Sequence, residues 1–409
     1  MRKRIKQILA GALCFGLAIS DKSALSLGEI NMDKVTVQAA ENVSDITIDG
    51  NNINKENKNG LTYKGFGLLT ANSTSDLLMD YKAEHPEKYV EMLQYLFGGS
   101  KPLMTHVKIE MGNDRNNSTG AESCTMRTED ETANVKRNAG FQLAADAKKI
   151  NPNIKISILR WNTPKWANTT EKQYKWYKNT IMAAYETYGY MVDYINPNRN
   201  EAWSDKTDTE NVKKFAKWIQ EENSDTIKDA KALDLYKKIK FIVSDEAEMI
   251  AKTAVNALYT DEEYKNAVAA IGWHYPYSVA SKSRDGADIL TKDDIIKIAD
   301  EMDKEVWNSE NQAVFSDSAF RPANNTTFKD DSGNVIADSS GLGGTGSALE
   351  MGNYIIKSFV ESRRTHVIYQ PVIGAFYQGG QYSSKELIGA KDPWSGYVRY
   401  DAGTAILSH

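Results

Sequence analysis

The sequence alternates short runs of β-branched and aromatic residues with longer polar stretches of helical periodicity, and this alternation constrains the fold most strongly. Strands are predicted at 63–69, 105–111, 155–159, 194–197, 240–244, 270–274, 305–309 and 387–390, with a further strand or turn near 367–373. Helices are predicted at 89–97, 134–149, 172–188, 209–222, 246–257, 292–302 and 348–362. Such alternation occurs in doubly wound sheets and in α/β barrels. Eight strands over roughly 330 residues favour a (β/α)8 TIM barrel with long loops.

Composition is that of an ordinary globular protein and excludes some functions. Of the 409 residues, 50 are basic and 55 acidic, so the net charge of −5 gives no electrostatic basis for nucleic-acid binding. The two cysteines, Cys14 and Cys124, provide neither a disulfide framework nor a cysteine-based zinc site. We expect no cofactor and no metal. The aromatic residues (21 Tyr, 11 Phe and 8 Trp) are numerous enough to fill a core and also to stack on a ligand.

The N-terminus has the pattern of a secretory signal. Four basic residues among the first six precede an apolar run at 8–19, which is too short to cross a bilayer. An uncleaved anchor is the alternative. We expect a signal peptide and leader at 1–40, a strand (Asp45–Gly50) and linker at 41–60, and a catalytic barrel at 61–409. A secreted or cell-surface protein without a stable membrane span is expected.

Two glutamates follow predicted barrel strands. Glu201 comes after the fourth strand in Asn-Glu-Ala-Trp, and Glu310 after the seventh in Trp-Asn-Ser-Glu. The C-terminal ends of barrel strands face the active site, so the two carboxyl groups can meet across the barrel mouth. A pair about 5–5.5 Å apart hydrolyses glycosides with retention, one attacking the anomeric carbon and the other serving as acid and then base. The ordinary alternative is a solvated surface charge, as for most of the acidic residues.

Further candidates each have a plain structural explanation too. Trp161, after the third strand, either stacks on a sugar or caps the core. His274, at the end of the sixth predicted strand, either orients a catalytic glutamate or is a satisfied buried histidine. Tyr369 and Trp394 are expected to line one cleft with Trp161 and to exclude water from the reacting centre.

Several motifs in this order resemble glycoside hydrolase family 59, the galactosylceramidase family. They are Gly65–Gly67, Val107–Glu110 followed by Gly112 and Asp114, Asn151–Ile154, Trp161–Trp166, Ser244-Asp245, Gly272–Pro276 and Asp392–Gly396, together with the two glutamate motifs. The likeness runs from about Ile46 to the end of the chain. Taken together, the order and spacing of these motifs are fairly specific.

The resemblance implies an α/β-barrel β-galactosidase acting on galactosides such as galactolipids, with a carbohydrate or glycolipid as substrate. It implies Glu201 as acid/base and Glu310 as nucleophile. Beside the sugar it places Asn200, Trp161 and a hydroxyl of Ser118 or Thr119, and we expect His274 and Tyr275 there as well. Tyr369 stands where the family has a tryptophan.

The family usually continues into a β-sandwich and a lectin-like domain, whereas this chain stops at His409, soon after the eighth predicted strand. We therefore expect a truncated barrel that lacks these domains and its last outer helix. Apolar residues of the last segments would then be left uncovered, namely Leu387, Ile388, Ile406 and Leu407.

Three functions are compatible with this pattern. The first is a secreted retaining exo-β-galactosidase, with a blind pocket closed by the loops at 112–131 and 316–347. The second is an endo-β-galactanase or another retaining β-glycanase on the same barrel, with an open groove. The third is a non-catalytic carbohydrate-binding barrel, against which the presence of both glutamates argues.

Overall fold

A computed structural model describes residues 62–71, 74–115, 121–200, 206–246, 252–274, 297–298, 300–311, 345–374, 386–390 and 393–409. The chain divides into two compact units, Met1–Asn54 and Lys55–His409, and every described residue belongs to the second. The expected signal peptide, the strand Asp45–Gly50 and most of the loop at 316–347 lie outside the described residues.

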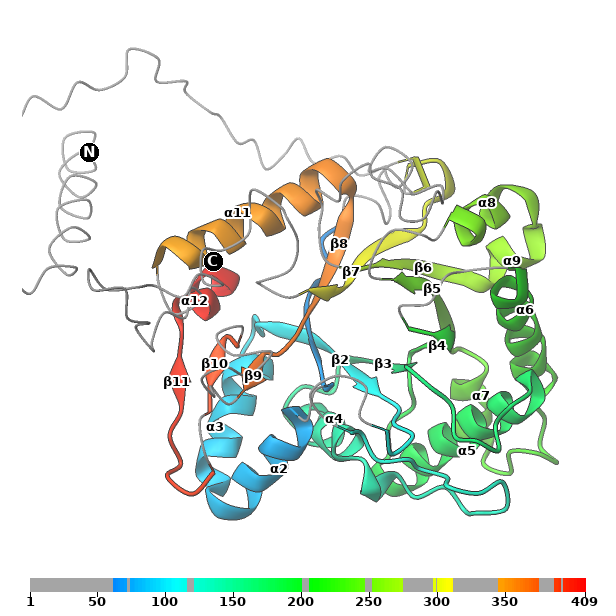
Figure 1. The fold of residues 1–409 in the computed structure, drawn as a ribbon, viewed down its shortest axis with the longest axis horizontal. Helices are drawn as coiled ribbons and strands as arrows, with labels where there is room; N and C mark the ends of the chain where they lie inside the picture. The colour runs from blue at the N-terminus through cyan, green and yellow to red at the C-terminus, as the bar shows by residue number, and fades with distance from the viewer. Residues whose placement is uncertain are drawn as a thin grey trace, which may run out of the picture. The chain divides into compact units, whose positions relative to one another are not determined.

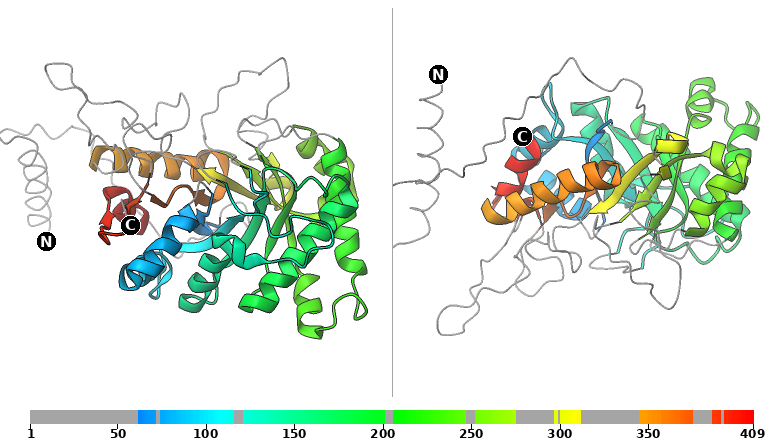
Figure 2. Two further views of the ribbon diagram at one scale, coloured as in Figure 1. Left: turned by 60° about the horizontal axis from the view of Figure 1, so that its bottom comes forward. Right: turned by 90° about the horizontal axis from the view of Figure 1, so that it is seen from above.

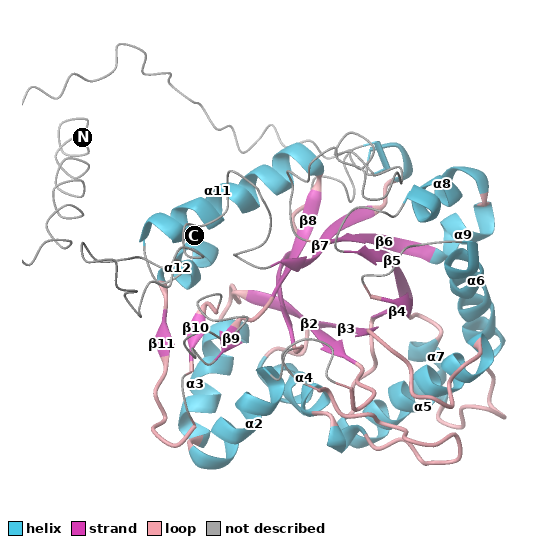
Figure 3. Ribbon diagram, viewed as in Figure 1, coloured by secondary structure: helices cyan, strands magenta, loops and turns pink. Residues whose placement is uncertain are grey.

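Eight parallel strands close into a barrel in which each strand pairs with its sequence neighbours and β8 pairs with β1. The strands are β1 Gly65–Leu69, β2 Met104–Glu110, β3 Lys155–Arg160, β4 Tyr194–Arg199, β5 Lys240–Glu246, β6 Val268–Trp273, β7 Glu305–Asn311 and β8 Arg364–Tyr369. Figure 1 and Figure 3 show them at the centre of a ring of helices. The prediction of a (β/α)8 TIM barrel is therefore confirmed.

The helices cover the outside of the barrel in chain order. They are α2 Thr74–Glu84, α3 Pro86–Phe97, η2 Val135–Arg137, α4 Ala139–Ile150, α5 Thr170–Tyr188, α6 Lys206–Glu221, α7 Ala230–Tyr236, α8 Lys252–Thr260, α9 Glu262–Ala267, α11 Thr345–Ser362 and α12 Ala402–Ser408. Figure 2 shows the helices of the first half side by side along one flank. None of the helices in the described part of the chain combines the length and the apolar character that crossing a membrane requires.

Local sequence sets the helix boundaries, as α5 illustrates. The Thr169 side chain accepts a hydrogen bond from the Lys172 backbone N–H and so caps the first turn. Gly189 ends the helix in the left-handed conformation (φ 79°), which a glycine adopts without steric cost. The helix predicted at 172–188 is thus confirmed within two residues.

Alternation along the strands divides the core into two layers. The inner layer fills the barrel with Leu69, Ala71, Leu159, Tyr194, Ile242, Ala270, Trp307 and Ile368. The outer layer joins the opposite strand faces to the helices, with residues such as Val107, Ile156, Ile195 and Val367. Parallel strands are buried on both faces in this way, because helices cover the side that the barrel does not enclose.

The eighth strand lies earlier in the chain than we expected. Arg364–Tyr369 closes the barrel, whereas the predicted strand at 387–390 contributes β10 (Ile388–Gly389) to a small sheet with β9 (Ile373–Gly374) and β11 (Arg399–Tyr400). The last segments are also covered, since Leu387 and Ile388 are fully buried and Leu407 of α12 is 7% exposed. The expectation of an uncovered final strand was therefore wrong.

Two histidines form a neutral hydrogen-bonded layer inside the barrel. His366 Nδ1 lies 2.8 Å from the Gly65 carbonyl oxygen, His106 Nδ1 lies 2.9 Å from His366 Nε2, and His106 Nε2 lies 2.8 Å from Ser157 Oγ. A carbonyl oxygen only accepts, so His366 Nδ1 donates to Gly65 and His366 Nε2 accepts from His106 Nδ1. His106 Nε2 in turn accepts from the Ser157 hydroxyl. Burial lowers the pKa of His366 to about 4 and that of His106 well below its usual value.

These buried histidines should make the fold sensitive to acid. Between the ordinary pKa of 6.5 and the folded value of about 4, the unfolded chain binds a proton that folded His366 does not. The free energy of unfolding should therefore decrease as the pH falls through that window, by on the order of 2 kcal/mol at about pH 5 for this residue. Urea unfolding at pH 7 and pH 5 measures the change. His366→Gln should lose less stability over the same interval, and an equal loss would contradict the assignment.

Candidate active site at the barrel mouth

Five strand ends bring polar side chains together at the C-terminal mouth of the barrel. The residues are Asn200 after β4, Asp245 on β5, His274 after β6, Glu310 on β7 and Gln370 after β8. None is more than 2% exposed. Because parallel strands end on the same side of the barrel, residues far apart in sequence converge here.

A buried ion pair lies beneath this group. Lys108 Nζ, on β2, donates to both carboxylate oxygens of Asp245 at 2.8 Å and to the Ser309 carbonyl oxygen at 3.0 Å. Burial alone would raise the pKa of Asp245, but the charge of Lys108 and the hydrogen bonds from His274 and Lys108 lower it well below its usual value. Asp245 is therefore a carboxylate at neutral pH.

Glu310 is held by Gln370 and lies close to His274. Gln370 Nε2 donates to Glu310 Oε1 at 2.6 Å. His274 Nδ1 lies 3.8 Å from Glu310 Oε2, and its Nε2 lies 2.8 Å from Asp245 Oδ1. The hydrogen bond from Gln370 therefore orients the carboxyl group, and the imidazole lies beside its other oxygen beyond hydrogen-bond distance.

Asn200 connects the end of β4 to the same group. Its backbone N–H donates to the Arg160 carbonyl oxygen at 2.8 Å. With its amide nitrogen turned toward Asp245, the side chain donates to the backbone oxygen and to Oδ2 of that residue, each at 3.2 Å. Asn200 and His274 thus reach Asp245 from the ends of different strands.

The structure describes some of the expected site residues and not others. Asn200, His274 and Glu310 lie in one buried cluster, whereas Glu201, Ser118, Thr119 and Tyr275 lie outside the described residues, so the separation of the two glutamates stays a prediction. Trp161 is partly buried and packs against the apolar layer inside the barrel.

The structure does not bring the three expected aromatic residues into one cleft. Tyr369 is fully buried in the outer core layer, because its side chain leaves β8 on the face that packs against the helices. Trp394 is 77% exposed. Its carbonyl oxygen lies 2.9 Å from Nε2 of His85, the residue that joins α2 to α3. For these two residues the expectation of a shared wall with Trp161 was wrong.

Sequence reasoning gave no role to Lys108, Asp245 or Gln370. A signal existed for Lys108, because strands of a parallel barrel are buried on both faces, so a cation in the middle of the second strand requires a buried partner. Asp245 directly follows the strand predicted at 240–244, as Glu310 follows the one predicted at 305–309. Among the described residues, no group of three His, Cys, Asp or Glu side chains could hold a metal ion.

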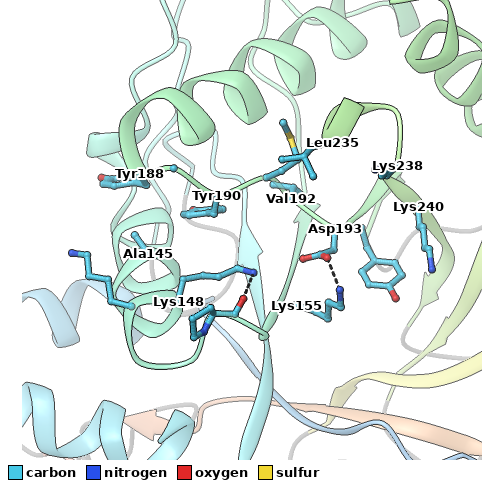
Figure 4. Close-up of a pocket in the computed structure, with 15 residues that line it drawn as sticks. Ala145, Lys148, Lys155, Tyr188, Tyr190, Val192, Asp193, Leu235, Lys238 and Lys240 are labelled. Carbon is cyan, nitrogen blue, oxygen red and sulfur yellow. Dashed lines mark hydrogen bonds and ion pairs between the residues drawn. The ribbon is translucent and has the colours of Figure 1, made fainter. Parts of the chain in front are cut away.

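A cavity of about 650 Å³ lies at the opposite end of the barrel (Figure 4). It opens beside Lys155 and Lys240, which begin β3 and β5. Its lysines have structural partners, since Lys155 pairs with Asp193 at 2.9 Å and Lys148 donates to the Ile154 carbonyl oxygen at 2.7 Å. We therefore assign the reaction to the mouth and not to this cavity.

Comparison with known proteins agrees with the barrel and its motifs. Residues 63–409 match the model of glycosyl hydrolase family 59. The galactocerebrosidase of Danio rerio is 25% identical over 361 residues, covering 86% of this chain and 44% of the relative. The galactocerebrosidase of Mus musculus is 26% identical over 368 residues, covering 86% and 43%. The chain thus spans less than half the length of these curated relatives.

Solved structures share the fold at low identity. SrfJ from Salmonella typhimurium superposes with a TM-score of 0.59 at 14% identity, over 85% of this chain and 74% of that chain. At such low identity, the likeness concerns the barrel alone.

Replacing one member of the buried ion pair should lower the free energy of unfolding more than replacing both. Asp245→Asn leaves the Lys108 charge buried without its counter-ion and should lower the free energy of unfolding by about 3–5 kcal/mol. The double variant Lys108→Met/Asp245→Asn leaves no such charge, so its free energy of unfolding should decrease markedly less. Urea unfolding of both variants measures this, and equal losses would contradict a buried ion pair.

Proposed function

Because this chain belongs to glycosyl hydrolase family 59, we propose that it is a retaining β-galactosidase with Glu310 as nucleophile and Glu201 as acid/base. The observation that carries the proposal is the setting of Glu310, a buried carboxylate at the barrel mouth between Gln370 and His274. A nucleophile needs a fixed approach to the anomeric carbon, and the hydrogen bond from Gln370, with His274 beside the other oxygen, supports one.

The position of Glu201 supports its role as acid/base. It directly follows Asn200, whose side chain and backbone N–H are both held at the end of β4. The residue that precedes Glu201 in the sequence is therefore fixed at the same mouth as Glu310. Strands four and seven are the arrangement that the family resemblance implies for acid/base and nucleophile.

Hydrolysis then proceeds by double displacement. The Glu310 carboxylate attacks the anomeric carbon and forms a glycosyl ester, while the Glu201 carboxyl group gives its proton to the departing glycosidic oxygen. Glu201, now ionised, removes a proton from water, which attacks the same carbon and releases Glu310. Two inversions restore the β configuration.

The substrate proposal is a terminal β-galactoside, with a galactolipid as the natural form. Its support is the name of the curated relatives, galactocerebrosidases, which this chain resembles at 25–26% identity. The basic and apolar N-terminal pattern supports a secreted or cell-surface enzyme, which would meet such substrates outside the cell.

The roles of the two glutamates can be separated by leaving group. Glu310→Gln should lower the turnover rate of every aryl β-galactoside by several orders of magnitude, because no glycosyl ester forms. Glu201→Gln should slow formation of the ester about 10²–10⁴-fold for a poor leaving group, and far less for dinitrophenolate, which departs without a proton. Pre-steady-state release of the phenol measures that step. The reverse pattern would exchange the two roles.

Substrate class and stereochemistry are tested together. In a panel of aryl β-glycosides, the β-galactoside should be hydrolysed fastest, and proton NMR should show the β-anomer as the first product. A first product in the α-configuration would exclude retention. Faster hydrolysis of the internal bonds of a β-glycan than of the aryl galactoside would show an endo-acting enzyme and contradict the exo-enzyme proposal.

A further inference from the structure

A series of buried polar groups leads from β2 to Glu310, joined by hydrogen bonds as far as His274. Lys108 donates to both oxygens of Asp245, Asp245 Oδ1 lies 2.8 Å from His274 Nε2, and His274 Nδ1 lies 3.8 Å from Glu310 Oε2. The four residues come from β2, β5, β7 and the end of β6. Each ring nitrogen of His274 therefore faces a carboxylate, one from the strand before it and one from the strand after it.

The backbone at Asp245 is strained. Ser244 and Asp245 have φ angles of 73° and 56°, in the left-handed region that residues other than glycine rarely occupy. The register of β5 against β6 shifts between Ser244 and Glu246 at the same point. Two consecutive left-handed residues persist only where the surroundings fix them, and such strain gathers at functional sites.

The neighbouring strand leaves room for this bend. A Cβ at Gly272 of β6 would lie 3.1 Å from Asp245 Cα and 2.6 Å from Ser309 Oγ. Any side chain at this position would push β5 and β7 away from β6. The glycine thus permits the close approach that brings Asp245 under His274.

Stability alone does not account for this arrangement. A buried ion pair is often no more stabilising than apolar side chains of similar volume, because both charges lose their hydration. Here the pair is combined with a strained backbone and a required glycine. All three features serve to fix one atom group, the Asp245 carboxylate, at one place.

We propose that Asp245 is a positioning residue for the hydrolysis, fixing the His274 ring and the Asn200 amide and, through His274, the direction in which Glu310 attacks. Lys108 holds Asp245 in turn. The inference rests on the proposed function, since the direction of Glu310 matters only if Glu310 is the nucleophile. Asp245 itself stays beneath the reacting atoms and touches no substrate.

The test measures formation of the glycosyl ester directly. The probe is an activated 2-deoxy-2-fluoro glycoside of the sugar that the aryl glycoside panel selects, which esterifies the nucleophile and leaves it only slowly. In the wild-type protein, peptide mass spectrometry should find the sugar on Glu310. In Lys108→Met/Asp245→Asn the same residue should be labelled about 100-fold more slowly at saturating probe, with little change in the probe concentration that gives half the maximal rate.

A matched control separates positioning from loss of stability. His366→Gln disturbs the other buried polar layer of the barrel, which makes no contact in the chain that leads to Glu310. It should lower the free energy of unfolding and still be labelled at the wild-type rate.

The outcomes are distinct. Labelling of the folded double variant at the wild-type rate overturns the positioning role and leaves the proposed function intact. A wild-type protein labelled at another residue, or not at all, overturns the role of Glu310 and with it this inference. If the double variant does not fold, His274→Gln replaces it. Glutamine has a single donor nitrogen, which can meet Asp245 but leaves no second nitrogen to face Glu310. Slow labelling therefore supports the inference, and labelling at the wild-type rate overturns it.

Discussion

Closure of the barrel between β8 and β1 is the constraint on which the rest of the structure depends. In the closed sheet every barrel strand has a partner on both sides, and the eight strands keep one direction. This geometry sets Gln370, at the end of the last strand, beside Glu310 from the strand before it. It also lets Lys108 on β2 reach Asp245 on β5 across the interior. An open sheet with the same strands would place β2 and β5 several strand widths apart, about 4.7–4.9 Å for each step, and the ion pair could not form.

The interior of this barrel separates its polar groups into two layers of opposite character. In the lower layer, burial lowers the pKa of His106 and His366, so the two rings stay neutral and exchange hydrogen bonds. Around Asp245 the charge of Lys108 outweighs the effect of burial, so the carboxylate stays ionised. This difference in ionisation comes from the partner of each group and not from its burial. The side chains of both layers, His106, His366, Lys108 and Asp245, are all almost completely inaccessible to solvent. Charge is therefore concentrated directly beneath the proposed nucleophile.

Much of this could be predicted from the sequence, and the errors have physical causes. Hydrophobic alternation located the first seven strands, because each is an apolar run bounded by polar segments. The eighth was misplaced because the apolar run at 387–390 has the same local pattern as a barrel strand and differs only in its partners, β9 and β11. Tyr369 was assigned to the cleft because it stands where the family has a tryptophan, and this correspondence does not say which face of β8 carries the side chain. Lys108 was visible as a cation in the middle of a barrel strand, but its partner is 137 residues away, and sequence spacing does not identify such a contact.

The dispersal of the site over the chain has a consequence for how the protein is made. The contacts that hold Glu310 join β2 to the end of β8, and Gln370 lies 60 residues after the glutamate that it holds. During synthesis from the N-terminus, Lys108 and Asp245 emerge well before the strand that closes the barrel. No fragment that stops short of β8 can contain the complete arrangement, so catalytic competence should arise late and in a single step with tertiary closure. Enzymatic turnover would then report on the cooperative assembly of the whole barrel and not on the folding of any one strand–helix unit.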